Sequence, residues 1–395
     1  MALLAGPPAL ADEVPTRIAP IEDPTGCALE RFHRALADPE RQGPVRVVHI
    51  GDSHVAGDYM TGDVRRRLQA RFGIGGPGLT LPGRPWPAHR HTELRFGTTG
   101  PWKTIRMNRA EPEDGILGLT GVAQVSEHPG GVLWAESASG LPGAVATHLE
   151  VAYVKQPGGG RLAIWIDGRR DTSFSTDSET PQVAYWEAGV TEGAHRVEIR
   201  HVAGGPVRVL GVLFERDAGL VYDSLGTNGA RLANLDRTHP ATFATDLARR
   251  APALVVLAFG TNEMDDEEVP PGDIGAAAIE TLHRVRTAAG RASCLVVSPP
   301  DRGCEEENGW KTCPRIPLLV DAFRSAALRA GCAFWDQQAA MGGDGSIAAW
   351  AQETPPLAAR DRVHLTVAGY RLLSEAFATA LLQSHDAWLA RQTSR

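Results

Sequence analysis

Three short polar segments carry residue types that together can attack an ester. Ser53 ends a Gly-Asp-Ser sequence directly after an apolar run, so its hydroxyl is predicted to lie on a turn between a strand and a helix. Backbone N–H groups at a helix start are unpaired and can receive an oxyanion. Near the other end of the chain, Asp361 and His364 supply an orienting acid and a base. Asn262, in a Gly-Thr-Asn-Glu sequence, follows a second apolar strand.

The joint arrangement of these segments is more informative than any one of them. Gly-Asp is ordinary turn chemistry, and a single histidine before a helix is commonly a cap or a surface residue. All three segments nevertheless fall at the C-terminal edge of a predicted strand or at a helix start, which is where open α/β sheets build their sites. Ser53 is therefore the candidate nucleophile, and His364 is the candidate base.

Strands alternate with helices in two stretches of the chain. The first stretch runs from an apolar strand at 45–50 into a helix over 61–72, in which Val64, Leu68 and Phe72 share one face. The pattern resumes near residue 221. Further strands are predicted at 253–259, 294–298 and 332–335, and further helices at 241–250, 275–289, 318–330 and 366–383. This alternation indicates a mainly parallel sheet that is covered by helices on both faces.

Between these stretches, from about 85 to 215, helical periodicity nearly vanishes. Short alternating runs separated by Gly and Pro turns take its place, which predicts an antiparallel β-sandwich. The runs lie at 115–125, 131–136, 148–154, 161–167, 182–186, 195–201 and 207–214. The β-domain is thus expected to be inserted into the α/β domain after its first strand and helix.

The polar segments resemble the blocks of the SGNH (GDSL-type) hydrolase family. The first block matches residues 51–54, the third 260–263 and the fifth 361–364. The resemblance implies a flavodoxin-like three-layer α/β/α fold and a triad of Ser53, His364 and Asp361, with no metal and no cofactor. It also implies an oxyanion hole made by the backbone N–H of Ser53, a glycine N–H from the second block and the Asn262 amide. Gly226 and Gly229 both fit the second block, and Gly229 is favoured.

A narrower resemblance, to the peptidoglycan O-acetylesterase branch of the family, comes from the segments 62–78 and 204–226. In that branch a jelly-roll-like, carbohydrate-binding-module-like domain follows the first block. The implied division is a signal-like segment and lead-in helix at 1–43, a discontinuous hydrolase domain at 44–84 and 216–395, and the insert at 85–215. The implied activity is removal of acetyl groups from the muramic acid 6-hydroxyl through an acetyl-serine intermediate.

Three alternatives to this activity stay open at this point. The same triad can pass an acetyl group to a sugar hydroxyl, as in polysaccharide acetyltransferases, because only the position of water or sugar decides the second step. It can also serve an acetylxylan-type esterase. The third alternative belongs to another class, a non-catalytic glycan-binding protein whose functional part is the β-domain.

Composition narrows the possible partners and location. The 395 residues carry 40 Lys and Arg against 47 Asp and Glu, a formal charge of −7, which provides no basic surface for nucleic acid. No run approaches the roughly 20 apolar residues of a membrane span. The first 12 residues end in an Ala-Leu-Ala-Asp sequence that resembles the end of a secretory signal. An acetylated glycan partner and a periplasmic or secreted location are therefore expected.

Several further residues receive a prediction. Cys304 and Cys313 can close a small disulfide, whereas Cys294 and Cys332 are expected to be buried free thiols. The His-Arg-His-Thr-Glu sequence at 89–93 is expected to be an exposed loop rather than a metal site. The acidic run 265–268 is expected to be a solvated loop near the mouth of the site. Five aromatic residues of the β-domain are candidates for glycan contact, although core packing is the commoner role: Trp102, Trp134, Trp165, Trp186 and Tyr185.

Overall fold

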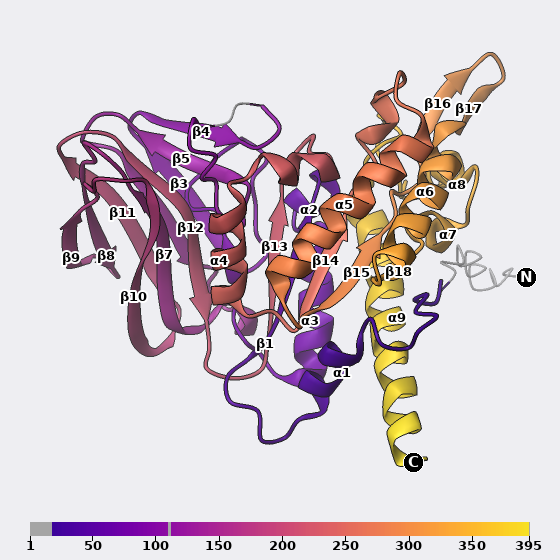
Figure 1. Cartoon of the computed structure of the whole chain (residues 1–395), viewed down its shortest axis with the longest axis horizontal. Coiled ribbons are helices and arrows are strands. Elements are labelled where there is room, and N and C mark those ends of the chain that lie inside the picture. Colours follow the sequence, from indigo (N-terminus) through magenta and orange to yellow (C-terminus); the bar gives the residue numbers. More distant parts are fainter. Residues whose placement is uncertain (1–17, 110–111, 395) are drawn as a thin grey trace, which may run out of the picture.

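The computed structural model describes residues 18–109 and 112–394. Figure 1 shows an antiparallel β part beside a part in which helices surround a parallel sheet. The signal-like sequence at the N-terminus lies outside the described residues. Among the described helices, none is long and apolar enough to cross a membrane.

The parallel sheet has five strands in the order β13-β1-β14-β15-β18. Their bounds are Val45–Gly51 (β1), Leu220–Gly226 (β13), Leu254–Ala258 (β14), Ser293–Val297 (β15) and Ala333–Trp335 (β18). Gly51 is in register with both Gly226 and Ala258, so the three neighbouring strands β13, β1 and β14 end at one level. The polar segments that follow these strands are thereby brought to one edge of the sheet, as the sequence predicts.

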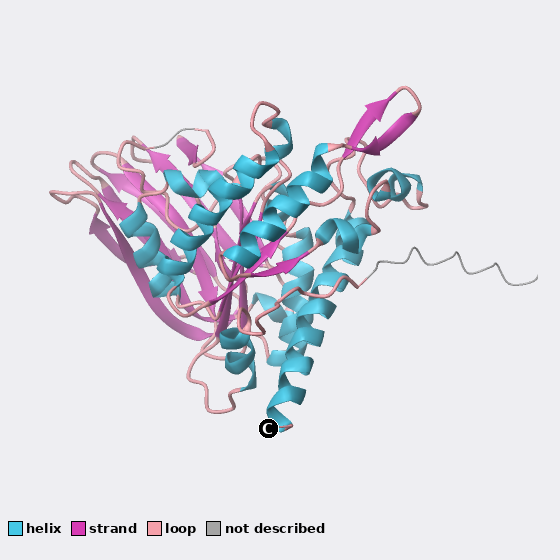
Figure 2. Cartoon of the chain, turned by 45° about the vertical axis from the view of Figure 1, so that its right-hand side comes forward, coloured by secondary structure: helices cyan, strands magenta, loops and turns pink. Residues whose placement is uncertain are grey.

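Helices cover both faces of this sheet (Figure 2). Alternate residues of β1 show the two faces, because Val47 packs into one core cluster while Val48 and Ile50 pack into another. The Val47 side is covered by α1 (Glu30–Ala37), α3 (Tyr59–Phe72), α7 (Gln337–Met341), α8 (Ser346–Gln352) and α9 (Val367–Thr393). The other side is covered by α4 (Pro240–Arg250), α5 (Pro271–Ala289) and α6 (Arg315–Arg329). The predicted mainly parallel sheet between helical layers is confirmed.

The β part consists of two antiparallel sheets that enclose one apolar core. One sheet has the order β10-β7-β12-β5-β4, with β2 also paired to β12, and the other has the order β3-β6-β11-β8-β9. The bounds in the first sheet are Gly78–Thr80 (β2), Trp102–Arg106 (β4), Val122–Ser126 (β5), Ala146–Lys155 (β7), Gln182–Gly193 (β10) and Val207–Glu215 (β12). Those in the second are Leu94–Thr99 (β3), Val132–Ser137 (β6), Arg161–Ile166 (β8), Arg169–Ser175 (β9) and Arg196–Ala203 (β11). Strands β2, β3, β4 and β9 were not predicted, because each is short or largely polar, and the run predicted at 115–125 is a strand only from Val122.

The two parts share buried contacts. Leu79 of β2 and Leu210 of β12 belong to the same apolar cluster as Val48 of the parallel sheet. Across the seam, the Tyr185 hydroxyl donates to Asp246 of α4. Arg249 of α4 forms an ion pair with Glu150 of β7 at 2.7 Å. The sandwich is therefore packed against the α4 side of the parallel sheet.

The disulfides correct one prediction and confirm another. Cys294 and Cys332 form a disulfide, so the expectation of two free thiols is wrong. Strands β15 and β18 pair in parallel with Leu295 opposite Ala333, which puts the preceding cysteines side by side at a Cα separation of 4.7 Å. The predicted Cys304–Cys313 bond is present, and the segment between them forms a hairpin of β16 (Gly303–Glu306) and β17 (Gly309–Thr312). This hairpin projects from the α/β part in Figure 1.

Candidate active site

Ser53 lies where β1 gives way to the short helix α2 (Ser53–Ala56). Asp52 caps this helix by accepting a hydrogen bond from the His54 backbone N–H at 2.9 Å. The turn also depends on Gly51, since a Cβ there would lie 2.6 Å from the Ala258 carbonyl oxygen and 2.5 Å from a Val55 methyl carbon. Ser53 itself is half-buried, so its hydroxyl can be reached from outside.

A hydrogen-bonded chain joins Ser53 to His364 and Asp361. The Ser53 Oγ lies 2.9 Å from His364 Nε2, and His364 Nδ1 lies 2.8 Å from Asp361 Oδ2. This geometry assigns the proton of the neutral imidazole to Nδ1 and leaves Nε2 free to accept from the serine. The structure thus brings Ser53 together with His364, which is 311 positions later in the chain, and with Asp361.

The loop that holds Asp361 and His364 is closely tied down. Asp361 Oδ1 accepts from the backbone N–H groups of Val363 at 3.0 Å and His364 at 2.9 Å. Partial burial raises the pKa of this carboxyl, but the hydrogen bonds from His364 and Val363 outweigh burial and hold the pKa below its usual value. Arg362 between them has a left-handed φ of 55°, and its carbonyl accepts from Gly303 N–H at 2.8 Å. The base of the β16–β17 hairpin is therefore hydrogen-bonded to the loop that holds Asp361 and His364.

The two glycines of the second block have different surroundings. Gly226 ends β13 against α2, and a Cβ there would lie 2.0 Å from the Ala56 backbone nitrogen, so this glycine serves close packing. Gly229 is half-buried and has a φ of 78°, a conformation that strongly favours glycine. Asn262 donates its amide to the carbonyl of Ala230 at 2.9 Å. Gly229 and Asn262 therefore occupy neighbouring loops, and the role of Gly229 as the oxyanion donor stays a prediction.

Glu263 has a structural role that the sequence did not reveal. Its carboxylate accepts from the Leu232 N–H at 2.8 Å and from the Gly260 N–H at 3.0 Å, and it is buried. Burial raises the pKa of Glu263 to about 7 despite these hydrogen bonds. The side chain thus joins the loop after Gly229 to the loop that carries Asn262.

His54 packs against His364. Its ring is 5.3 Å from that of His364, and its Nδ1 lies 2.9 Å from the Tyr370 hydroxyl. Burial, together with the neighbouring His364, lowers the pKa of His54 to about 3. The His54 imidazole that packs against His364 is therefore neutral at physiological pH.

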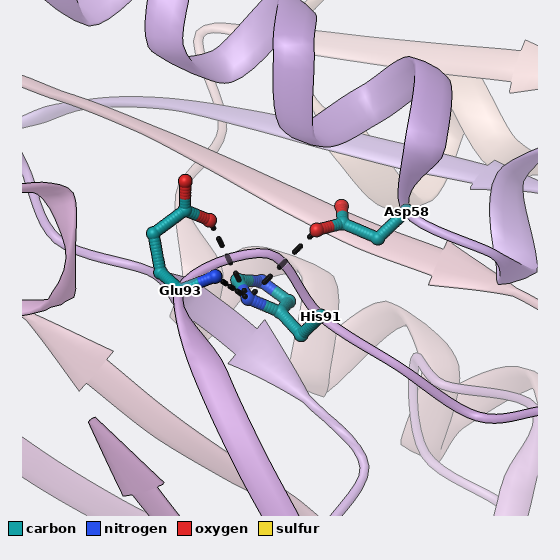
Figure 3. Close-up of side chains that lie close together, drawn as sticks. All are labelled: Asp58, His91 and Glu93. Carbon is teal, nitrogen blue, oxygen red and sulfur yellow. Dashed lines mark hydrogen bonds and ion pairs between the residues drawn. The ribbon is translucent and has the colours of Figure 1, made fainter. Parts of the chain in front are cut away.

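The segment 89–93 is not the exposed loop that was predicted. His89, His91 and Glu93 are all buried, and Asp58, His91 and Glu93 each offer a metal-ligating atom within 4.8 Å of the others (Figure 3). The fully buried Arg65 contacts both carboxylates, at 2.7 Å from Asp58 and closely at Glu93. Because this guanidinium already supplies the balancing positive charge, the cluster fits a buried ion-pair network better than a metal site.

Two of the aromatic candidates of the β-domain lie on the outer face of a sheet. Arg196 covers the Trp134 ring at 4.1 Å, and Arg200 covers the Trp165 ring at 4.0 Å. The other three are engaged elsewhere, since Trp102 and Trp186 pack against the sandwich core and Tyr185 is bonded to Asp246. The acidic run behaves as predicted in being largely exposed, with Asp265 and Asp266 paired to Arg302 and Arg231.

Comparisons with known proteins agree with this fold. Residues 189–372 match the model of the GDSL-like Lipase/Acylhydrolase family. A structure described as a peptidoglycan O-acetylesterase in action superposes with a TM-score of 0.75 at 23% identity, covering 93% of this chain and 98% of that chain. A family two carbohydrate esterase from Clostridium thermocellum with cellohexaose gives a TM-score of 0.32 at 13% identity, covering 65% and 93%. The acetyl xylan esterase AlAXEase gives a TM-score of 0.31 at 18% identity, covering 41% of this chain and 80% of that chain. A search of curated protein sequences gave no match.

The family match identifies residues 189–372 as an acylhydrolase domain, and the likeness to the solved structure shows the fold of the chain. The chain carries a GDSL-like lipase/acylhydrolase domain. The matched segment includes Gly229, Asn262, Asp361 and His364. Ser53 precedes the segment because most of the antiparallel strands lie between the serine and the rest of the site.

Proposed function

We propose that the protein is a serine esterase that removes O-acetyl groups from a polysaccharide, with O-acetylated peptidoglycan as the favoured substrate. The observation that carries this proposal is the hydrogen-bonded chain from Ser53 through His364 to Asp361. The choice of peptidoglycan rests on likeness in architecture, since 93% of the chain follows the fold of a structure described as a peptidoglycan O-acetylesterase.

In the first step, His364 Nε2 takes the proton of Ser53 as its oxygen attacks the acetyl carbonyl carbon. Asp361 holds the imidazole in the required tautomer and stabilises the imidazolium. The oxyanion is received by the N–H groups of Ser53 and Gly229 and by the Asn262 amide. His364 then returns the proton to the departing sugar oxygen, which leaves an acetyl group on Ser53.

In the second step, water attacks the acetyl carbon and gives its proton to His364. The same oxyanion donors serve the second tetrahedral intermediate, and acetate leaves as Ser53 recovers its proton. A sugar hydroxyl in place of water would make the protein an acetyltransferase. Because Asp361 and His364 are each substantially exposed, at 50% and 40% of their side-chain surfaces, water can approach this site.

The antiparallel part is proposed to be a jelly-roll-like, carbohydrate-binding-module-like domain at 85–215. The hydrolase domain is proposed to comprise 44–84 and 216–395. Strand β2 within 44–84 pairs with β12, so the two domains are interleaved at this point. A periplasmic or secreted location is supported by the Cys294–Cys332 and Cys304–Cys313 disulfides, which persist in oxidising compartments.

The test is acetate release from O-acetylated peptidoglycan and from acetylxylan, by the wild type and by Ser53→Ala. Release that depends on Ser53 and favours peptidoglycan supports the proposal. A preference for xylan retains the mechanism and changes the substrate. If neither glycan releases acetate while a small acetyl ester is still cleaved, acetyl transfer becomes the better assignment. Complete inactivity would favour the glycan-binding alternative.

A further inference from the structure

A groove of about 500 Å³ lies beside the candidate active site. Its lining includes Tyr59 of α3 and Val367, the first residue of α9, three positions after His364. The remaining wall is charged: Arg66, Arg90 and Arg371 stand against a single carboxylate, Asp63. This positive groove contrasts with the formal charge of −7 on the whole chain.

Two of these arginines have no carboxylate partner among the described residues. Arg66 forms an ion pair with Asp63 at 2.7 Å, and Asp63 is also shared with Arg67. The side chains of Arg90 and Arg371 form no ion pair or hydrogen bond within the described part of the chain. Arg90 instead lies over the Tyr59 ring at 3.9 Å, which fixes its planar guanidinium beside the groove.

The groove is connected to the catalytic histidine by a column of aromatic rings. Tyr59 stacks on Tyr370 with a centroid separation of 5.7 Å, and the Tyr370 hydroxyl contacts His54. His54 in turn lies under His364. The groove is thus separated from His364 by one short column of packed rings, and Val367 of its lining follows His364 by three residues.

The loop that presents Arg90 is anchored by the buried ion-pair network. His89, His91 and Glu93 point inward, and the Thr92 N–H donates to Asp58 at 2.7 Å. Figure 3 shows His91 between Asp58 and Glu93 in this anchor. Because the residues on both sides of Arg90 are held in this way, the backbone position of Arg90 is fixed by the fold.

A second cavity lies between α4 and the sandwich, and the arginines in its lining are paired with carboxylates. It has a volume of about 230 Å³, and its lining includes Arg46, Arg249 and Arg250. Each of these arginines is neutralised there by a carboxylate, as Arg250 is by Glu215 and Asp223. The groove beside the triad is therefore the better candidate for an anionic ligand.

We propose that the groove of Tyr59, Arg90 and Arg371 is a subsite for a carboxylate borne by the acetylated glycan. Guanidinium groups bind carboxylates through paired, charge-assisted hydrogen bonds, and two unpaired arginines beside one site favour an acidic polymer over a neutral one. This inference rests on the proposed esterase function and specifies its substrate class. Peptidoglycan carries carboxylates, whereas unsubstituted acetylxylan does not.

The first test compares kcat/KM for acetyl release from O-acetylated peptidoglycan and from acetylxylan. In the double variant Arg90→Gln/Arg371→Gln, the ratio of the two kcat/KM values is expected to fall about tenfold or more through KM. The dependence of kcat/KM for peptidoglycan on salt concentration should also be weaker in the double variant than in the wild type. The matched control is Arg291→Gln/Arg329→Gln, which removes the same charge from two exposed arginines elsewhere on the α/β part. An equal fall in the control, or no fall in the double variant, overturns the inference.

The second test does not depend on catalysis. Wild type and the double variant are sedimented with insoluble peptidoglycan from which acetyl groups have been removed, and with insoluble xylan. Retention of the wild type by peptidoglycan alone, lost in the double variant, supports the carboxylate subsite even if no ester is cleaved. Equal retention of the two proteins, including no retention of either, overturns it. Thermal melting of each variant checks that the fold is intact.

Discussion

The parallel-sheet part and the antiparallel sandwich use polar residues in different ways. Parallel strands all end at one edge, so residues after β1, β13 and β14 meet there although they are distant in sequence. In the sandwich, side chains alternate along each strand, so Trp134 and Trp165 are spread over an outer face and covered by arginines. The topology of the sheet, rather than its composition, therefore gathers the candidate site.

Buried charge also separates the two parts. Around the parallel sheet, Asp52, Asp58 and Glu263 are buried and hold loops through backbone or guanidinium contacts. The core between the two antiparallel sheets consists of apolar side chains. Buried carboxylates therefore lie around the parallel sheet and at its seam with the sandwich, where Glu93 and Glu215 are also buried and paired with arginines.

The largest expected effect is on the chemistry of the parallel-sheet part. Ser53→Ala should lower kcat/KM for a small acetyl ester by at least about 10⁴-fold, because it removes the nucleophile. The measurement is steady-state hydrolysis, with melting temperature as the check on folding. Activity within tenfold of wild type would show that this edge is not the catalytic one.

The next effect concerns the buried ion pairs of that same part. Arg65→Met should lower the free energy of unfolding by about 3–5 kcal/mol, since Asp58 and Glu93 lose their shared cation. Urea unfolding measures the change. The matched control is Arg170→Met on the exposed surface of the sandwich strand β9, for which a change within about 0.5 kcal/mol is expected. Equal effects of the two substitutions would remove the contrast between the parts.

The next prediction concerns the candidate oxyanion donor Asn262, whose loss should affect the reaction rate rather than the stability of the fold. Asn262→Ala should lower kcat by about 10²–10³-fold, because one donor to the oxyanion is lost. Asn108→Ala is the control, since Asn108 holds the same region by donating to the Asn228 carbonyl at 2.8 Å. A similar loss in both variants would indicate that loop order, rather than the Asn262 donor, limits the rate.

A buried histidine of the parallel sheet gives a pH-dependent prediction. Burial lowers the pKa of His49 to about 3, so its contribution to stability is present above its unfolded value of 6.5 and is lost as pH falls toward 3. In His49→Gln, the slope of unfolding free energy against pH between 4 and 6 should decrease by about 1.4 kcal/mol per pH unit. The exposed His283→Gln is the control. An unchanged slope would show that His49 does not titrate on unfolding.

The smallest expected effect lies in the sandwich. Trp134→Ala/Trp165→Ala should change kcat/KM for the small ester by less than about twofold, because these rings lie on an outer face covered by Arg196 and Arg200. Hydrolysis of the same ester is measured beside Ser53→Ala. A large loss would mean that the sandwich acts directly on the reaction.

Sequence patterns were sufficient for the main architecture and for the candidate triad. The alternation of strand and helix periodicity predicted the parallel sheet, and the turn glycines predicted the antiparallel part. They failed at 89–93, where polar residues that look like a surface loop are buried beside Arg65. No local pattern reveals a charge partner supplied by another element, so a buried ion pair reads as exposed polar sequence.

Turn chemistry and periodicity are local properties, so sequence patterns were enough to single out Ser53, Asp361, His364 and Asn262 as candidates. The same patterns also predicted the order of the strands that carry them. The tertiary structure alone decided which distant groups meet. It paired Cys294 with Cys332 through the register of β15 and β18 and assigned Glu263 to a loop junction. It also left the Arg90 and Arg371 side chains without a carboxylate partner among the residues that the structure describes. Each of these depends on distances between elements, which packing sets and local sequence does not encode.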